Sequence, residues 1–254
     1  MLRITNISKS FDDKNVLDSI SGEFLPGKVN YIIGASGSGK TVLLKCIVGL
    51  LKPDTGSVFF DDMNLVTALF NKRKKILREI GMLFQGSALF DSMNVQENIL
   101  FPLDRFSQLN CEKKIERVNF CLERVKLSGS NKLSMSELSG GMRKRVGIAR
   151  AIALNPRYLF CDEPNSGLDP QTSIVIDKLI KEITVEFNMT TLVVSHDMNS
   201  VLETGDSIIF IHQGKKCWEG NREEILHSDN TWLNEFVFAG PHQKMLRDKI
   251  ENRK

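Results

Sequence analysis

The sequence lacks several features that would assign it to a special class of protein. None of its five cysteines forms a Cys-x-x-Cys pair, so zinc sites and disulfides are disfavoured and reduced thiols are expected. The first residues hold no signal-peptide core, and no apolar run approaches the length that crosses a bilayer. The net charge of +3 is too small to indicate a nucleic-acid-binding protein. We therefore expect a chain that is not itself embedded in a membrane, although its partner can be.

The chain does have the length and composition for a substantial core. Its 254 residues are 41% hydrophobic and 26% charged, which is ordinary for a globular protein. They hold no internal repeat and no low-complexity linker. We predict a single domain over residues 1–240, with a helical part at about 95–145, and then a charged tail over residues 241–254.

The most informative stretch is the glycine-rich sequence GASGSGKT at residues 34–41. An apolar run at residues 29–33 precedes it and predicts a buried strand, and residues 42–50 predict a helix. This strand–GxxxxGK[ST]–helix context is the one that a phosphate-binding loop requires, whereas a chance match would be a plain Gly/Ser turn. Backbone N–H groups of such a loop converge on phosphate oxygens. The expected phosphate-binding residues are Gly34, Ala35, Ser36, Gly37, Ser38, Gly39, Lys40 and Thr41.

Two side chains of this loop have individual roles in the prediction. Lys40 is expected to reach the terminal phosphates, and the hydroxyl of Thr41 is expected to hold Mg²⁺. Both roles presuppose a nucleoside triphosphate as the ligand. The loop therefore predicts a nucleoside triphosphate and Mg²⁺ as cofactors.

Strand and helix patterns along the chain predict an α/β fold with a mixed sheet. Residues 2–8 alternate apolar and polar and predict an edge strand, and residues 16–24 predict a second strand. Helical periodicity runs from about 95 to 125, with Pro102 as an interruption. The other predicted elements are strands at 57–60, 80–84, 158–161 and 191–194, helices at 143–154 and 171–187, and a final hairpin at 207–218.

Four polar residues follow predicted buried strands, namely Gln85, Asp162, Glu163 and His196. Each alone has an ordinary structural explanation, such as a solvated strand end. Ligands of open α/β sheets gather at the carboxyl ends of strands, so one sheet would bring all four to the phosphate loop. Asp162 is then expected to hold Mg²⁺ with Thr41, and Glu163 to act as general base toward water. His196 would sense the terminal phosphate, and Gln85 would reach Mg²⁺ or the water.

A second glycine-rich turn, residues 138–142, does not fit a self-contained site. It opens a helix and is therefore suited to phosphate, but it lies near the far end of the predicted helical part. We expect it not to reach the phosphate loop of its own chain. The economical solution is that Ser139, Gly140 and Gly141 meet the nucleotide that a second copy binds.

The whole series of motifs resembles that of ABC-transporter ATPase subunits. Residues 34–41 match the Walker A motif, Gln85 the Q-loop, 138–141 the signature, 158–163 Walker B, 166–169 the D-loop and His196 the switch histidine. The resemblance covers nearly the whole chain. It implies the P-loop ABC ATPase fold, with a mixed sheet core, an antiparallel β-subdomain and a helical subdomain.

The same resemblance implies a head-to-tail dimer that sandwiches two ATP molecules. Each ATP would lie between the phosphate loop of one copy and residues 139–141 of the other. Phe11 falls where an aromatic residue stacks on adenine, although tyrosine is commoner there, and Val16 is expected beside the same nucleotide. Asp169 would make contacts across the dimer.

Two stretches narrow the resemblance to the MlaF/Mkl-type phospholipid-transport ATPases. They are residues 81–95 around Gln85 and the signature with Met142, where many importers carry glutamine. The D-loop has the general ABC form, and the tail matches no pattern, so both depart from that subfamily. The resemblance implies phospholipid transport through a separate permease, with a lipid-binding protein and a small regulatory protein as further partners. The ATPase would lie peripherally on the cytoplasmic face of the inner membrane.

Two other functions compete with this one. The first is an ATPase subunit of an importer for a polar solute such as an amino acid. The second is an ABC protein that acts on DNA or ribosomes, a class that usually has two ATPase units in one chain or a long coiled-coil insertion. This sequence has neither, so we expect no nucleic-acid partner.

Overall fold

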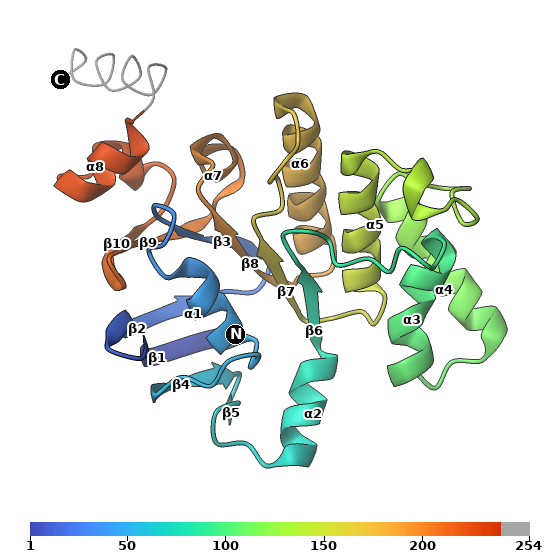
Figure 1. Ribbon diagram of the computed structural model, residues 1–254, viewed down its shortest axis with the longest axis horizontal. Coiled ribbons are helices and arrows are strands. Elements are labelled where there is room, and N and C mark those ends of the chain that lie inside the picture. Colours follow the sequence, from blue (N-terminus) through green and yellow to red (C-terminus); the bar gives the residue numbers. More distant parts are fainter. Residues whose placement is uncertain (240–254) are drawn as a thin grey trace.

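The computed structural model describes residues 1–239, which form two β-sheets and the helices packed on them (Figure 1). The charged tail predicted over residues 241–254 lies outside the described residues. Within the described part, no helix is long and apolar enough to span a membrane.

The larger sheet is mixed, as the sequence predicts. Its strand order is β10-β9-β3-β8-β7-β6. All neighbours pair in parallel except β10, which is antiparallel to β9. The inner strands are continuous apolar runs because helices or the other sheet cover both of their faces. The strands are β3 Lys28–Ile33, β6 Ile80–Leu83, β7 Tyr158–Asp162, β8 Thr190–Ser195, β9 Ser207–His212 and β10 Lys215–Gly220.

The smaller sheet is antiparallel and corresponds to the predicted β-subdomain. It consists of β1 Leu2–Phe11, β2 Lys14–Phe24, β4 Thr55–Phe60 and β5 Met63–Asn64, in the order β2-β1-β4-β5. The prediction of an edge strand at residues 2–8 was wrong, because β1 pairs with β2 on one side and with β4 on the other. Alternation of apolar and polar residues indicates that one face of the sheet is buried and the other is solvated. A central strand of such a sheet shows this pattern as well as an edge strand does.

Helix α1, Lys40–Ile47, packs between the two sheets. Its Leu43, Leu44 and Ile47 are fully buried in a cluster with residues of β1 and β2 and with one face of the larger sheet. The other face of that sheet is covered mainly by α5, Gly140–Ile152, and α6, Pro170–Glu186. Both faces of the sheet are therefore buried, so polar groups can gather at the strand ends.

A helical region lies beside β6, at the right of Figure 1. It contains α3 Val95–Phe106, α4 Cys111–Arg124, the short 3₁₀ helix η1 Met135–Glu137 and the start of α5. The predicted interruption at Pro102 was wrong, because α3 runs through this residue. The helical structure is interrupted later, between the end of α3 at Phe106 and the start of α4 at Cys111. A capping box at Asn94 and Glu97 holds the start of α3, so one missing N–H does not end the helix.

Helix α5 begins at Gly140, three residues before the predicted start, because the Ser139 side chain caps it. The remaining elements are α2 Phe70–Arg78, α7 Met198–Thr204, the 3₁₀ helix η2 Glu224–His227 and α8 Thr231–Val237. Helices α7 and α8 lie near the carboxyl ends of β8 and β9, on the side where the phosphate loop opens (Figure 1).

Candidate nucleotide site

The phosphate loop connects β3 to α1 and depends on glycine at two close backbone approaches. Gly34 has φ 152°, and a Cβ there would lie 2.2 Å from the Ile211 carbonyl oxygen. Gly39 has φ 104°, and a Cβ there would lie 2.8 Å from the Val16 carbonyl oxygen. Any side chain at either position would force the loop away from β9 or β2. The sequence thus closes the loop tightly enough to turn its N–H groups inward.

Lys40 and Ser38 give this loop the chemistry of an anion site. The Lys40 ammonium is only 6% exposed and donates to the carbonyl oxygens of Gly34, at 2.9 Å, and Ala35, at 3.0 Å. Burial lowers the pKa of Lys40, while Glu163 and Asp162 favour its charged form. The buried Ser38 hydroxyl has no partner among the described residues. A desolvated cation beside an unsatisfied hydroxyl fits phosphate oxygens.

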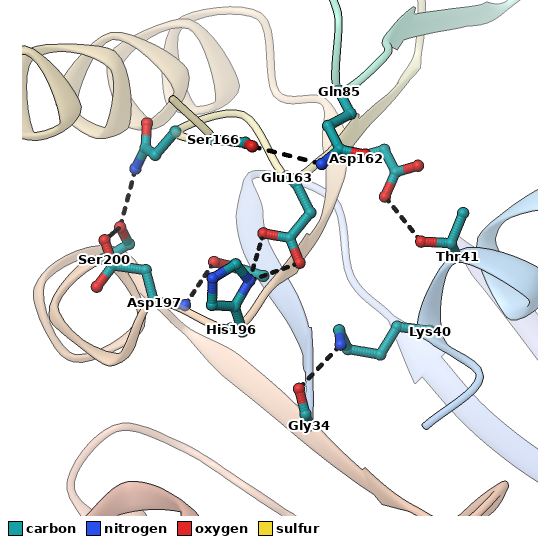
Figure 2. A network of polar contacts seen from close by, with 12 residues as sticks. Gly34, Lys40, Thr41, Gln85, Asp162, Glu163, Ser166, His196, Asp197 and Ser200 are labelled. Carbon is teal, nitrogen blue, oxygen red and sulfur yellow. Dashed lines mark hydrogen bonds and ion pairs between the residues drawn. The ribbon is translucent and has the colours of Figure 1, made fainter. Parts of the chain in front are cut away.

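Thr41 and Asp162 come together from α1 and β7. The Thr41 hydroxyl donates to Asp162 Oδ1 at 3.2 Å (Figure 2). Burial raises the pKa of Asp162, so a cation here would stabilise the ionised carboxylate. A hydroxyl and a carboxylate are the oxygen donors that Mg²⁺ prefers beside phosphates, so this pair fits the predicted metal.

Glu163 and His196 meet across the ends of β7 and β8. His196 Nδ1 lies 2.8 Å from Glu163 Oε2 and 2.9 Å from Oε1 (Figure 2). Glu163 has φ 48°, a left-handed conformation that few non-glycine residues adopt, and its N–H donates to the Val194 carbonyl oxygen at 2.9 Å. This turn directs the carboxylate away from the core and toward the phosphate loop.

Gln85 follows β6 and faces the D-loop. Its Nε2 lies 3.4 Å from the Ser166 hydroxyl (Figure 2). Its backbone carbonyl oxygen accepts a short hydrogen bond from the buried Lys144 ammonium. Both the side chain and the main chain of Gln85 are therefore held in place.

These groups surround one hollow of about 780 Å³. Gln85, Glu163 and His196 all line it, and Asp162 reaches it through Thr41. The carboxyl ends of three strands thus share a rim with the phosphate loop, which is the arrangement that the sequence predicts. The lining residues are Val16, Ala35, Ser36, Gly37, Gly39, Lys40, Thr41, Val42, Gln85, Glu163, His196, Phe236 and Ala239.

Besides Gly34 and Ser38 of the phosphate loop, five predicted binding residues do not line this hollow in the described chain: Phe11, Ser139, Gly140, Gly141 and Asp169. Phe11 ends β1 and is 44% exposed, with the Lys9 ammonium 5.5 Å from its ring centroid. Ser139 caps α5, and Asp169 caps α6 by accepting from the Thr172 N–H at 2.9 Å. Their roles stay predictions about a second copy or about the adenine.

Sequence reasoning missed four residues at or behind the site, of which Val42 directly follows the phosphate loop. Phe236 and Ala239 come from α8 and the residues after it, and only tertiary packing brings them to the hollow. Lys144 carried a usable signal, because it lies on the same helical stripe as Gly141 and Ile148, which are buried. A lysine on the apolar stripe of a helix indicates a buried ammonium with a specific partner.

The comparisons with known proteins agree with this site. The family model described as ABC transporter matches residues 17–166, which is more than half of the chain. The chain belongs to the ABC transporter ATP-binding family. The matched span runs from β2 to the D-loop and includes the phosphate loop, Gln85, the signature and Glu163. The chain is accordingly an ABC ATPase that binds and hydrolyses ATP.

Several relatives, and several solved structures of which one is described below, cover most of this ABC ATPase. It is 36% identical over 260 residues to the intermembrane phospholipid transport system ATP-binding protein MlaF of Haemophilus influenzae, covering 99% of this chain and 98% of that protein. It is 36% identical over 257 residues to the methionine import ATP-binding protein MetN of the same species, and the match covers 99% of this chain and 74% of MetN. It is 34% identical over 236 residues to the probable ribonucleotide transport ATP-binding protein mkl of Mycobacterium leprae, and the match covers 93% of this chain and 68% of that protein.

The solved structure is the dimeric ATP-binding cassette MJ0796 in a post-hydrolysis state with ADP and Pi. Its TM-score is 0.79 at 30% identity, over 87% of this chain and 99% of that one. The predicted ABC ATPase fold is therefore confirmed. The chain spans about two thirds of the length of the mycobacterial relatives.

Proposed function

We propose that this ABC ATPase powers phospholipid movement through a separate membrane permease. The observation that supports this substrate class is the match to the Haemophilus phospholipid-transport ATPase, which runs over nearly the whole of both chains. The relatives named for methionine and ribonucleotide transport are longer, so they carry further sequence that this match does not include. Transport of a polar solute such as methionine is the second candidate, because that relative has the same identity.

The working unit is a dimer of this chain bound to the permease on the cytoplasmic face of the inner membrane. MJ0796, a cassette of the same fold, is dimeric. In the dimer, Ser139, Gly140 and Gly141 of one copy contact the nucleotide held by the phosphate loop of the other, and Asp169 contacts the partner copy. Phe11 stacks on the adenine and Val16 lies beside it. A lipid-binding protein and a small regulatory protein are further partners.

The geometry supplies a role for each group in ATP hydrolysis. Lys40 and the N–H groups of the loop bind the β- and γ-phosphates, and Thr41, Asp162 and Gln85 hold Mg²⁺, which neutralises phosphate charge when bound. Glu163 accepts the proton of the attacking water, and His196 holds the Glu163 carboxylate toward the phosphate loop. The burial of Lys40 and Asp162 strengthens their electrostatic interactions with the ligand.

A transport assay separates the two candidate substrates. The tagged full-length chain is isolated with its permease and reconstituted into proteoliposomes that contain a fluorescent phosphatidylethanolamine. Phospholipid transport predicts ATP-dependent transfer of the label to acceptor vesicles, and Lys40→Ala should abolish it by weakening nucleotide binding. ATP-dependent movement of radiolabelled methionine, with no movement of lipid, would overturn the proposal and establish the second candidate.

A further inference from the structure

Lys144 is a buried cation that the roles above do not use. It lies in α5, five residues after Ser139, and it is only 5% exposed. Burial lowers its pKa, while Cys161, Asp162 and Glu163 favour its charged form. Among the described residues, none of the ion pairs involves Lys144, although a buried ammonium is normally paired with a carboxylate.

The partners of Lys144 are instead two main-chain carbonyl groups. Its ammonium donates to the carbonyl oxygen of Gln85 in a short hydrogen bond and to that of Glu163 at 3.5 Å. These residues follow β6 and β7, which are neighbouring parallel strands with Leu83 paired to Cys161. One ammonium thus joins the ends of two strands that both carry groups of the hydrolytic site.

Both carbonyl groups lie where the sheet itself provides no restraint. Gln85 lies beyond the last residue of β6, Leu83, so its carbonyl group is outside the strand. Glu163 has φ 48°, a conformation that costs free energy for a non-glycine residue and persists only when its surroundings hold it. The Glu163 carbonyl oxygen accepts from the Ser166 N–H at 3.1 Å and from the Lys144 ammonium at 3.5 Å. Lys144 is thus a second donor that supports this conformation and therefore the direction of the carboxylate.

Helix α5 does not need Lys144 in order to dock on the sheet. A Cβ at Gly147 would lie 2.7 Å from Leu83 Cδ1, and a Cβ at Gly81 would lie 2.3 Å from the Ala151 carbonyl oxygen. These close approaches, one to a side chain and one to the backbone, already fix α5 against β6. A buried ion can often be replaced by an apolar side chain of similar volume with no loss of stability, so a role in folding alone does not explain an ammonium here.

We propose that Lys144 is a positioning residue for ATP hydrolysis, which holds the main chain of Gln85 and Glu163 in register with each other and with α5. The inference rests on the proposed roles of Gln85 and Glu163. It also gives α5 a direct connection to the hydrolytic groups, because this helix begins at the signature and carries Lys144 about one and a half turns later. Binding of the partner's nucleotide at Ser139 would then act on a helix that is bonded to the site of its own chain.

The test compares three variants of the full-length chain. Lys144→Met keeps the length and apolar stem of the side chain but removes the donor. Lys144→Gln keeps an N–H donor on a shorter side chain. Arg145→Met is the matched control, because it removes a cation of the same helix whose guanidinium, among residues 1–239, donates a hydrogen bond only to the Lys126 carbonyl oxygen, at 3.4 Å. The readouts are kcat, KM for ATP, the Kd of a fluorescent ATP analogue and Tm.

We expect Lys144→Met to lower kcat about 10- to 100-fold, the size of effect that misplacement of a catalytic group by about 1 Å produces. The Kd of the analogue should stay within about threefold and Tm should not fall, because the phosphate loop is untouched and an apolar replacement relieves a buried charge. Lys144→Gln should recover part of the kcat, and Arg145→Met should match the original protein.

Three results would overturn the inference: an unchanged kcat in Lys144→Met, a loss of nucleotide affinity as large as the loss of kcat, or equal impairment of Lys144→Gln and Lys144→Met at equal Tm. If Lys144→Met unfolds, Lys144→Gln against Arg145→Met decides the question. Failure of the proposed roles themselves is distinguishable, because it appears as normal hydrolysis by Glu163→Gln.

Discussion

Glu163 combines a rare backbone conformation with a well-held carboxylate. Its φ of 48° turns the chain out of β7, and its carboxylate contacts His196 Nδ1 at 2.8 Å. The neighbouring Asp162 differs, because its carboxylate bonds the Thr41 hydroxyl beside the phosphate loop. Two adjacent acids thus face different partners, and this difference supports the proposed division into a metal ligand and a base.

Replacement of Glu163 by glutamine tests the second of these roles. Glu163→Gln keeps the size of the side chain but removes its capacity to accept a proton, so kcat should fall by about 10²- to 10⁴-fold while ATP binding persists. Steady-state ATPase assays and the Kd of a fluorescent ATP analogue measure the two effects. Glu182→Gln, at an exposed ion pair on α6, is the matched control. Hydrolysis by Glu163→Gln at the original rate would contradict the assignment of the base.

At the scale of elements, a buried polar cluster ties the D-loop to α6 and α7. Asn165 Nδ2 donates to Asp177 Oδ1 at 2.8 Å and to the Ser200 hydroxyl at 2.9 Å, and Ser200 donates to Asp197 at 3.2 Å. Asp177 is only 3% exposed. Its pKa is raised to about 6, chiefly by burial, with smaller contributions from Asp197 and Glu203, while hydrogen bonds to Ser200 and Asn165 oppose the rise. The cluster therefore buries a carboxyl group that ionises at a stability cost.

The raised pKa makes the stability of the chain depend on pH. The native state binds the Asp177 proton more tightly than the unfolded state, so its contribution is fully present below about pH 4 and is lost as pH rises through about 6. The rise of the Asp177 pKa from 3.8 to about 6 corresponds to roughly 3 kcal/mol of unfolding free energy, at about 1.4 kcal/mol per pKa unit.

Asp177→Asn retains an acceptor for Asn165 but cannot ionise, so it isolates this effect. Relative to the original chain, the variant should gain unfolding free energy between pH 4 and pH 7, by up to roughly 3 kcal/mol. Urea unfolding at several pH values measures this difference. Asp104→Asn, at an exposed ion pair of α3, is the control and should show little pH-dependent difference. A stability difference that does not change with pH would show that Asp177 is not the group responsible.

The elements also show how far the sequence could predict the fold and the site. Apolar runs precede each of the predicted site features, namely the phosphate loop, Gln85, Asp162, Glu163 and His196. Parallel strands bring the carboxyl ends of such runs together independently of the other elements, so these positions could be predicted. The error at β1 arose because apolar–polar alternation does not show whether a strand has one neighbour or two. The error at Pro102 arose because α3, whose start is held by a capping box, continues although Pro102 lacks a backbone N–H. Phe236 depends on tertiary packing, which no local pattern encodes, whereas Lys144 lies on a helical stripe with buried residues that the sequence does contain.

At the scale of the whole molecule, the described chain contains two separate elements suited to phosphate. One is the loop around Lys40, with its hollow of about 780 Å³, and the other is the capped start of α5 at Ser139, which does not line that hollow. The proposed head-to-tail dimer would use both, because each site would take its loop from one copy and its signature from the other. A single copy is then catalytically incomplete.

Complementation between two inactive variants tests this division. Ser139→Asp retains a side-chain acceptor that caps α5 but places a negative charge where the partner's phosphates would bind, and Lys40→Ala removes the loop cation. Each variant alone should have little ATPase activity. An equimolar mixture should recover about a quarter of the original activity, because half of the randomly formed dimers would hold one intact site of two.

The mixture distinguishes a shared site from two independent effects on one chain. Asn110→Asp, which adds the same charge at the cap of α4, controls for a general effect of charge on the helical region and should retain full activity. Activity should depend on the concentration of the mixture, since the intact site exists only in the dimer. Full turnover by Ser139→Asp alone, or no recovery on mixing two well-folded variants that still exchange subunits, would contradict the head-to-tail arrangement.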